Sequence, residues 1–268
     1  MAKKKFFVLV LLVLVLQVGL FVLFYYFFTN PPPGFMIIGP ALEELKGSMW
    51  LVGVLGPQSL FIPIIAIIIA GGSMSEEYER GTADILLSKP VTKIEYMTGK
   101  FVGGLSLLGF VIALTTTLGV ALAYGFFGPQ ESIQIAPAIY LVLLYANLLF
   151  FSMTFMFSEV LRRTTLSMLA SIGILVASTF IGGILSTMYL ISGEQLYVEI
   201  SKWLPNWSAS NLPSFVASEL ITALESPFIS LPGGDIQLAA AIIAVYTIAS
   251  ILIATLKLVK SDVTKKTD

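Results

Sequence analysis

Long apolar runs separated by short polar segments dominate the chain. A helix that crosses a membrane needs about 20 mostly apolar residues. Six runs reach that length, and none shows the strict alternation of apolar and polar positions that is typical of a membrane β-barrel. The predicted spans are Phe6–Phe28, Trp50–Ser73, Phe101–Phe127, Ala136–Ser158, Thr164–Ile191 and Ile236–Val259. The pattern therefore predicts an all-α integral membrane protein, with a single transmembrane domain over residues 1–268.

Composition supports a membrane protein and excludes an ordinary soluble domain. The chain is 57% apolar and 12% charged, whereas soluble domains carry about 25% charged residues. The first apolar run is longer than the core of a signal peptide, roughly 7–15 residues, and no small-residue cleavage pattern follows it. We therefore expect the first run to be retained as a membrane helix.

The basic residues predict the orientation. If both termini lie inside, thirteen of the fifteen Lys and Arg residues fall on the cytoplasmic side, and only Lys46 and Lys202 lie outside. Cytoplasmic loops of membrane proteins are enriched in Lys and Arg. The sequence thus predicts cytoplasmic termini in the cell (plasma) membrane.

The external connections are short, except for residues 192–235 between the fifth and sixth spans. Leu196, Ile200 and Trp203 recur there at helical spacing, which predicts a helix along the outer membrane interface. A second helical piece near Pro213 to Leu224 is expected to dip back toward the membrane.

Several kinds of chemistry are excluded by what the chain lacks. It contains neither His nor Cys, so Ser-His and Cys-His catalysis and the usual zinc sites cannot be built. It also lacks the Gly-rich phosphate loop that binds nucleotides. We predict no catalytic residue, no metal and no cofactor in this chain, and the composition gives no sign of nucleic-acid binding.

The polar residues inside the spans are neutral, and no charge lies near the middle of any span. Ion-coupled transporters usually keep an intramembrane charge as the coupling site, so the sequence disfavours ion coupling. Gln17, Gln58 and Asn147 are candidates for a substrate path. Hydrogen bonding between helices is the other role open to them.

One stretch between the second and third spans, residues 76–100, is crowded with charges of both signs. It holds five acids and four bases, whereas a loop that contacts lipid headgroups should be mainly basic. Leu86 and Leu87 would form an apolar pair on a short helix. A docking surface for another protein fits these features better than a solvated loop does.

The same stretch contains signals that end and start helices. Gly81 can end the helix that leaves the second span, and Thr82 can cap a short new helix that Pro90 stops. Thr92 and Glu95 have the spacing of a capping box, which would open the third span. The sequence therefore predicts a cytoplasmic elbow with a short helix at its tip.

The elbow resembles the cytoplasmic signature of type-2 ABC-transporter permeases, the membrane subunits of ATP-driven exporters. That signature reads E-x-E-x-G-T, then paired leucines, then P-V-S-R and a later G-K. The matching residues here are Glu77, Glu79, Gly81, Thr82, Leu86, Leu87, Pro90, Val91, Thr92, Lys93, Gly99 and Lys100. Thr92 and Lys93 replace the common Ser and Arg and keep the hydroxyl and the charge.

The resemblance implies a division of labour between subunits. Permeases of that family pair as dimers, and each copy docks a separate ATP-binding cassette subunit, which binds ATP and Mg²⁺, through a coupling helix. By this resemblance the docking residues are Glu77, Glu79, Gly81, Thr82, Ala83, Leu86, Leu87, Pro90 and Val91. The expected function is that of the permease subunit of an exporter, working as a homodimer in the bilayer.

Two other functions stay open on the residues alone. A membrane anchor could recruit a cytoplasmic partner through the same elbow, and an uncoupled pore or secondary transporter would need no ATPase. The substrate is also open: the apolar spans suit an amphipathic cargo, and a peptide or drug is compatible with them.

Overall fold

The computed structural model describes residues 3–30, 46–58, 61–82, 92–220 and 234–260; helices fill most of these ranges, and no strand occurs in them. The elements are α1 (Lys3–Thr29), η2 (Lys46–Ser48), α3 (Met49–Gln58), α4 (Phe61–Gly71), α5 (Ser75–Glu79), α7 (Lys93–Phe127), η3 (Ile133–Ile135), α8 (Ala136–Leu161), α9 (Thr164–Ser192), α10 (Gln195–Lys202), α11 (Pro205–Leu220) and α12 (Ile236–Lys260). Six segments are long and apolar enough to cross a membrane. The predicted fold class, all-α with six spans, is confirmed.

The second span is described as two helices, α3 and α4. Pro57 lies inside α3, where it cannot donate a backbone hydrogen bond. Pro63 lies in the first turn of α4, where backbone N–H groups have no helical partner in any case. Residues 59–60, between the two helices, lie outside the description.

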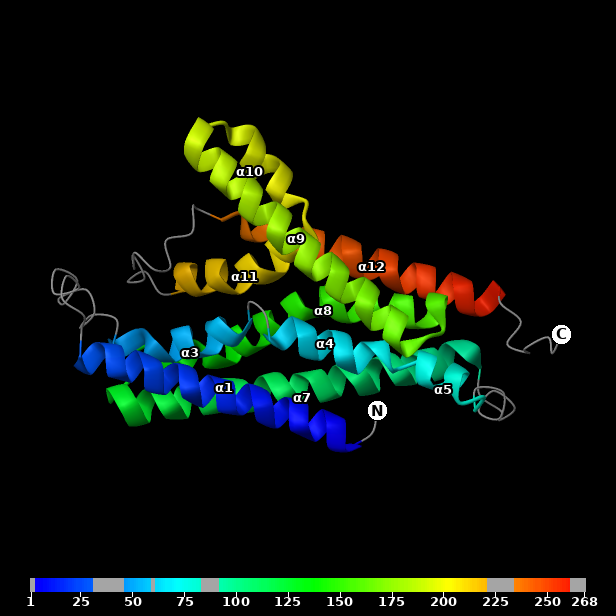
Figure 1. Ribbon diagram of the computed structural model, residues 1–268, viewed down its shortest axis with the longest axis horizontal. Coiled ribbons are helices and arrows are strands. Elements are labelled where there is room, and N and C mark those ends of the chain that lie inside the picture. The colour runs from blue at the N-terminus through cyan, green and yellow to red at the C-terminus, as the bar shows by residue number, and fades with distance from the viewer. Residues whose placement is uncertain (1–2, 31–45, 59–60, 83–91, 221–233, 261–268) are drawn as a thin grey trace.

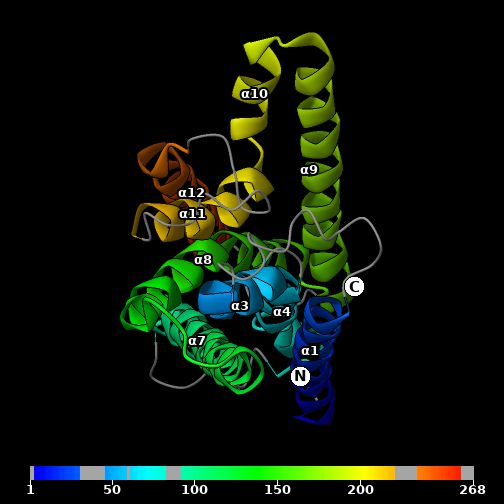
Figure 2. The same ribbon diagram turned by 90° about the vertical axis from the view of Figure 1, so that its left-hand side faces the viewer.

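Helix α8 is the central element of the bundle. It packs against α4, α7, α9, α11 and α12, and Figures 1 and 2 show it between these helices. Phe151 and Phe155 of α8 form an aromatic cluster with Phe101 of α7, with centroid distances of 5.2 Å from Phe101 to each ring. Such close aromatic packing fixes how α7 and α8 lie against each other.

Helix α9 starts within the bundle and then leaves it. Its second half and α10 project from the other helices (Figures 1 and 2). Helix α11 turns back and packs against α8 and α12, with Leu212, Phe215 and Ala217 buried. The expected second helical piece is thus present, but it begins at Pro205 rather than near Pro213. Proline suits the first position of a helix, which explains this start.

Helix α1 is held against α3 and α7 by hydrogen bonds, aromatic contacts and a close approach to a glycine. The buried Gln17 amide donates hydrogen bonds to the backbone oxygens of Gly53 in α3 (3.0 Å) and Thr115 in α7 (2.9 Å). One turn further on, the Phe21 ring lies against Gly53, where a Cβ atom would collide with it. Only glycine permits this contact between α1 and α3.

Replacing Gly53 should therefore loosen α1. Gly53→Ala is expected to lower the free energy of unfolding by about 1–3 kcal/mol, the usual cost of overpacking a core. Gly56→Ala is a matched control on the same helix, because a Cβ there meets no atom within 4 Å. Thermal unfolding in detergent micelles measures both variants, and equal melting temperatures would contradict the packing of α1 on α3.

Candidate functional site

The short helix α5 carries a polar cluster at one end of the bundle, where the chain leaves α4 (Figure 1). We call this cluster the elbow joint. Its members are Ser75, Glu77, Tyr78, Glu79, Lys100, Ser158, Glu159, Arg162 and Thr164. They come from α5, α7, α8, α9 and the two-residue connection between α8 and α9.

The turn from α4 into α5 is held by a hydroxyl group of α8. The Ser158 Oγ accepts the backbone N–H groups of Met74 (3.1 Å) and Ser75 (2.9 Å) and donates to the Gly71 oxygen (3.0 Å). These groups are buried, and leaving them without partners would cost about 1–3 kcal/mol each. A single serine therefore fixes where α5 begins relative to α8.

Glu79 connects α5 to the first turn of α9. One carboxylate oxygen accepts the backbone N–H of Thr164 (2.9 Å), and the other accepts its hydroxyl (3.0 Å). The N-cap residue of α9, Arg163, provides no side-chain cap. Because a negative charge stabilises a helix N-terminus, Glu79 takes the place of the missing cap.

Glu159 is fully buried near the end of α8 and is bound by α5. The Tyr78 hydroxyl donates to both of its carboxylate oxygens, at 2.9 and 3.2 Å. The Arg162 guanidinium lies 3.8 Å from the carboxylate and 4.5 Å above the Tyr78 ring. Burial, and next the nearby Glu159 charge, raise the pKa of Tyr78 above its ordinary value. The phenol therefore stays protonated and keeps donating at neutral pH.

Helix α7 joins the same cluster through charged side chains. Lys100 forms an ion pair with Glu77 of α5, and Lys93 donates to the backbone oxygen of Leu258 in α12 at 3.4 Å. Thr92 and Glu95 form the predicted capping box at the start of α7. Helix α7 thus begins at Lys93, directly after the predicted capping box, and includes the predicted membrane span Phe101–Phe127.

The end of α5 matches the prediction for Gly81. That glycine has a φ of +66°, and its N–H bonds the Tyr78 oxygen while the Thr82 N–H bonds the Glu77 oxygen. These two bonds form a Schellman motif, which suits glycine in the left-handed region. The remaining predicted docking residues, Ala83, Leu86, Leu87, Pro90 and Val91, lie outside the described residues.

The predicted path residues do not meet at one place that the structure describes. Gln17 bonds α3 and α7, as above, and Asn147 is buried in α8 and donates to the Leu143 oxygen at 2.8 Å. Gln58 ends α3, and its side chain is not described. The bonds of Gln17 are those of an interhelical contact, and a substrate path through these residues stays a prediction.

Sequence reasoning missed six members of the joint: Ser75, Tyr78, Ser158, Glu159, Arg162 and Thr164. Glu159 carries the one usable signal, an acid at the end of an apolar helix that must find a partner or water. The partner on α5 could not be found from spacing, because the contact joins residues about eighty positions apart in the chain.

The elbow joint thus holds charged and hydroxyl groups that bond to one another across four helices. What the arrangement can do is transmit a displacement of α5 to α7, α8 and α9. Each of those helices is linked to α5 by at least one charge-assisted bond, and these are the stronger hydrogen bonds in proteins.

Comparison with models of known families gives one match. The family described as "ABC-2 family transporter protein" matches residues 1–263, nearly the whole chain. No curated protein sequence matches it at a significant level.

Removing the Tyr78 hydroxyl should destabilise the joint. Tyr78→Phe leaves the buried Glu159 carboxylate without its donor, and we expect a loss of about 1–3 kcal/mol in unfolding free energy. Tyr124→Phe is the matched control, because Tyr124 is 60% exposed and should change the value by less than about 0.5 kcal/mol. Denaturant unfolding in micelles measures both. Equal losses would mean that the Tyr78 hydroxyl does not stabilise Glu159.

Removing the Glu79 carboxylate should loosen the start of α9 alone. In Glu79→Ala we expect the amides of residues 164–167 to exchange hydrogen about fivefold faster, the equivalent of about 1 kcal/mol for a lost cap. Glu95→Ala is the control, because it should speed exchange at the start of α7 and leave α9 unchanged. Hydrogen exchange read by mass spectrometry separates the two segments. Unchanged exchange at 164–167 would exclude Glu79 as the cap.

Proposed function

Because the chain belongs to the ABC-2 family of transporter proteins, we propose that it is the permease subunit of an ATP-driven exporter and that it is coupled to a separate ATP-binding subunit. The main support for coupling comes from the elbow joint. Helix α5, which leads into residues 83–91, is bonded to three of the membrane-spanning segments.

The proposed coupling surface is the tip of the elbow. Leu86 and Leu87 would insert into the ATP-binding subunit, with Pro90 and Val91 shaping the segment around them. Glu77 and Glu79 have a different part in this proposal, because both carboxylates bind groups within the chain itself. They would position the elbow rather than contact the ATP-binding subunit.

The geometry of α9 supports the transmission of movement. A helix of 29 residues is about 43 Å long at 1.5 Å per residue. A tilt of about 10° at Thr164 would therefore move the far end by about 7 Å. A small displacement of α5, imposed when two ATP-binding subunits close together, becomes a large one at the opposite end of α9.

In this proposal the chain hydrolyses no ATP itself. ATP and Mg²⁺ bind in the partner subunit, both termini and the elbow face the cytoplasm of the cell membrane, and two permease copies form the pathway. The projecting half of α9 supports a second copy. Leu190 and Ile191 at its end are 81% and 82% exposed, and a pairing of two permeases would cover such residues.

Copurification with the ATP-binding subunit tests the proposal. Leu86→Asp/Leu87→Asp should lower the ATPase recovered with the permease from gently solubilised membranes at least tenfold, since charges replace the docking pair. Leu196→Asp, a change of the same kind on the exposed surface of α10, should retain the ATPase.

Two results would overturn the proposal. Recovery of the same amount of ATPase with the double variant would exclude the leucine pair as the docking element. If no ATP-hydrolysing subunit accompanies the wild-type permease from membranes that contain one, an anchor or an uncoupled pore becomes the better function.

A further inference from the structure

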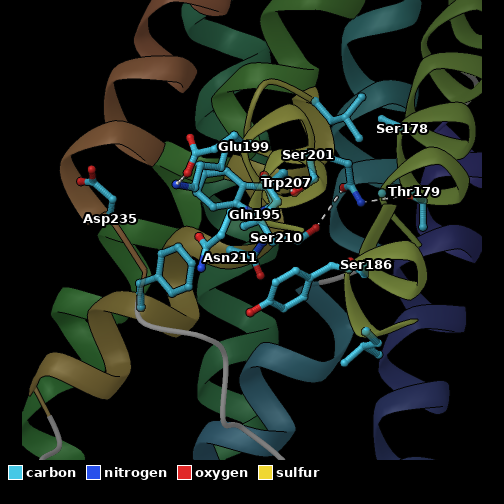
Figure 3. Close-up of a pocket in the computed structure, with 18 residues that line it drawn as sticks. Ser178, Thr179, Ser186, Gln195, Glu199, Ser201, Trp207, Ser210, Asn211 and Asp235 are labelled. Carbon is cyan, nitrogen blue, oxygen red and sulfur yellow. Dashed lines mark hydrogen bonds and ion pairs between the residues drawn. The ribbon is translucent and has the colours of Figure 1, made fainter. Parts of the chain in front are cut away.

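A cavity of about 790 Å³ lies between α9, α10 and α11, on the second half of α9 and away from the elbow joint (Figure 3). Its volume falls within the range of about 300–1,000 Å³ that is typical of small-molecule sites. No residue of the elbow joint lines it, and neither Gln17 nor Asn147 does.

Neutral groups that can form hydrogen bonds stand among apolar side chains in the lining of this cavity. Hydroxyls and amides reach it from all three helices, and Figure 3 shows them around one space: Ser178, Thr179, Ser186, Gln195, Ser210 and Asn211. A hydroxyl both donates and accepts, and an amide does the same through two atoms. Such a lining can bind a ligand that itself carries several hydroxyl groups.

Some polar side chains at the cavity already bond to each other, and others are available to a ligand. Asn206 donates to the Thr179 hydroxyl (2.9 Å) and accepts from the Ser210 hydroxyl (2.9 Å). In contrast, the side chains of Gln195 and Asn211 form no hydrogen bond within the part of the chain that the structure describes. These two amides can therefore bind a ligand without breaking an existing contact.

The charged residues at the cavity have partners. Lys202 is paired with Glu199 one turn away on α10, and Asp235 accepts the Leu238 backbone N–H (2.9 Å) at the start of α12. The Leu238 N–H is a neutral partner, so the lining holds two carboxylates for one cation. An anionic ligand would require an unpaired cation, and the lining therefore disfavours an anionic head group.

Apolar surface adjoins the polar cavity. The Trp207 and Phe215 rings pack edge to face on one side, with centroids 5.8 Å apart. On α9 a shallower hollow of about 480 Å³ shares Thr179 with the cavity and continues over Phe180, Ile184 and Met188. An uncharged head group in the cavity would thus have a hydrocarbon surface beside it.

We propose that this cavity binds the uncharged, hydroxyl-rich head group of an amphipathic lipid, such as a sugar- or polyol-bearing lipid, with its hydrocarbon chains along the apolar strip of α9. This assignment names the cargo class of the proposed exporter and rests on that function. The assignment also links the proposed tilt of α9 to transport. Tilting α9 relative to α11 would open or close the cavity that the two helices share.

Native mass spectrometry of the permease alone tests the assignment. The permease is kept in tetraethylene glycol monooctyl ether, a detergent without a sugar, and is released from these micelles in the mass spectrometer. Before release, it is mixed with equal amounts of monoglucosyl dioleoylglycerol, dioleoyl phosphatidylglycerol and dioleoyl phosphatidylcholine. We expect the glucolipid to be retained at least tenfold more than either phospholipid, because all three carry the same chains. Gln195→Ala/Asn211→Ala and the cavity-filling Ser186→Trp should each lower that retention about tenfold.

The control variants locate the effect. Ser106→Ala/Thr117→Ala removes two exposed hydroxyls of α7 that bond their own helix, and it should retain the glucolipid as the wild type does. Methyl β-glucoside, which has the head group without the chains, should fail to displace the lipid at a hundredfold excess.

Each contrary result would overturn one part of the lipid-binding proposal. Equal retention of phosphatidylglycerol would exclude the uncharged head group, equal retention by the cavity variants would exclude the site, and displacement by methyl glucoside would assign the cavity to a soluble sugar. This readout needs no ATPase, so its failure is distinguishable from a failure of copurification. Glu79→Ala should bind the glucolipid normally.

Discussion

The buried carboxylate of Glu159 is the constraint on which the end of the bundle depends. Removing an isolated charge from water costs several kcal/mol, and this side chain is fully buried among apolar helices. The Tyr78 hydroxyl and the Arg162 guanidinium offset that cost, and both must therefore stay in place. Because Tyr78 belongs to α5, the short helix cannot move away from α8 without removing a hydrogen-bond donor from this buried carboxylate.

The other bonds of α5 extend this constraint to the neighbouring spans. Glu79 closes the first turn of α9, and Glu77 is paired with Lys100 of α7. Helix α5 is only five residues long, too short to be stable alone, so these contacts decide its position. The joint is consequently a rigid attachment for the elbow, while the far half of α9 projects beyond the bundle with α10 packed against it.

The lengths of the apolar runs and the residues that cap or end helices predicted much of the fold. Runs of about 20 apolar residues can satisfy their backbone groups in a membrane only as helices, which is why the six spans were predictable. Gly81 and the Thr92–Glu95 pair act within four or five residues, so the end of α5 and the start of α7 were predictable too.

The sequence by itself determined which segments are helices, where short-range caps begin and end them, and which catalytic chemistry the chain lacks, because these properties depend on neighbouring residues and residue types. Tertiary structure alone decided that Tyr78 meets Glu159, that Glu79 caps α9, and that hydroxyls and amides of three helices surround one cavity. Those contacts join residues far apart in the chain. An apolar helix can pack in many orientations, so only the assembled bundle selects which polar side chains meet.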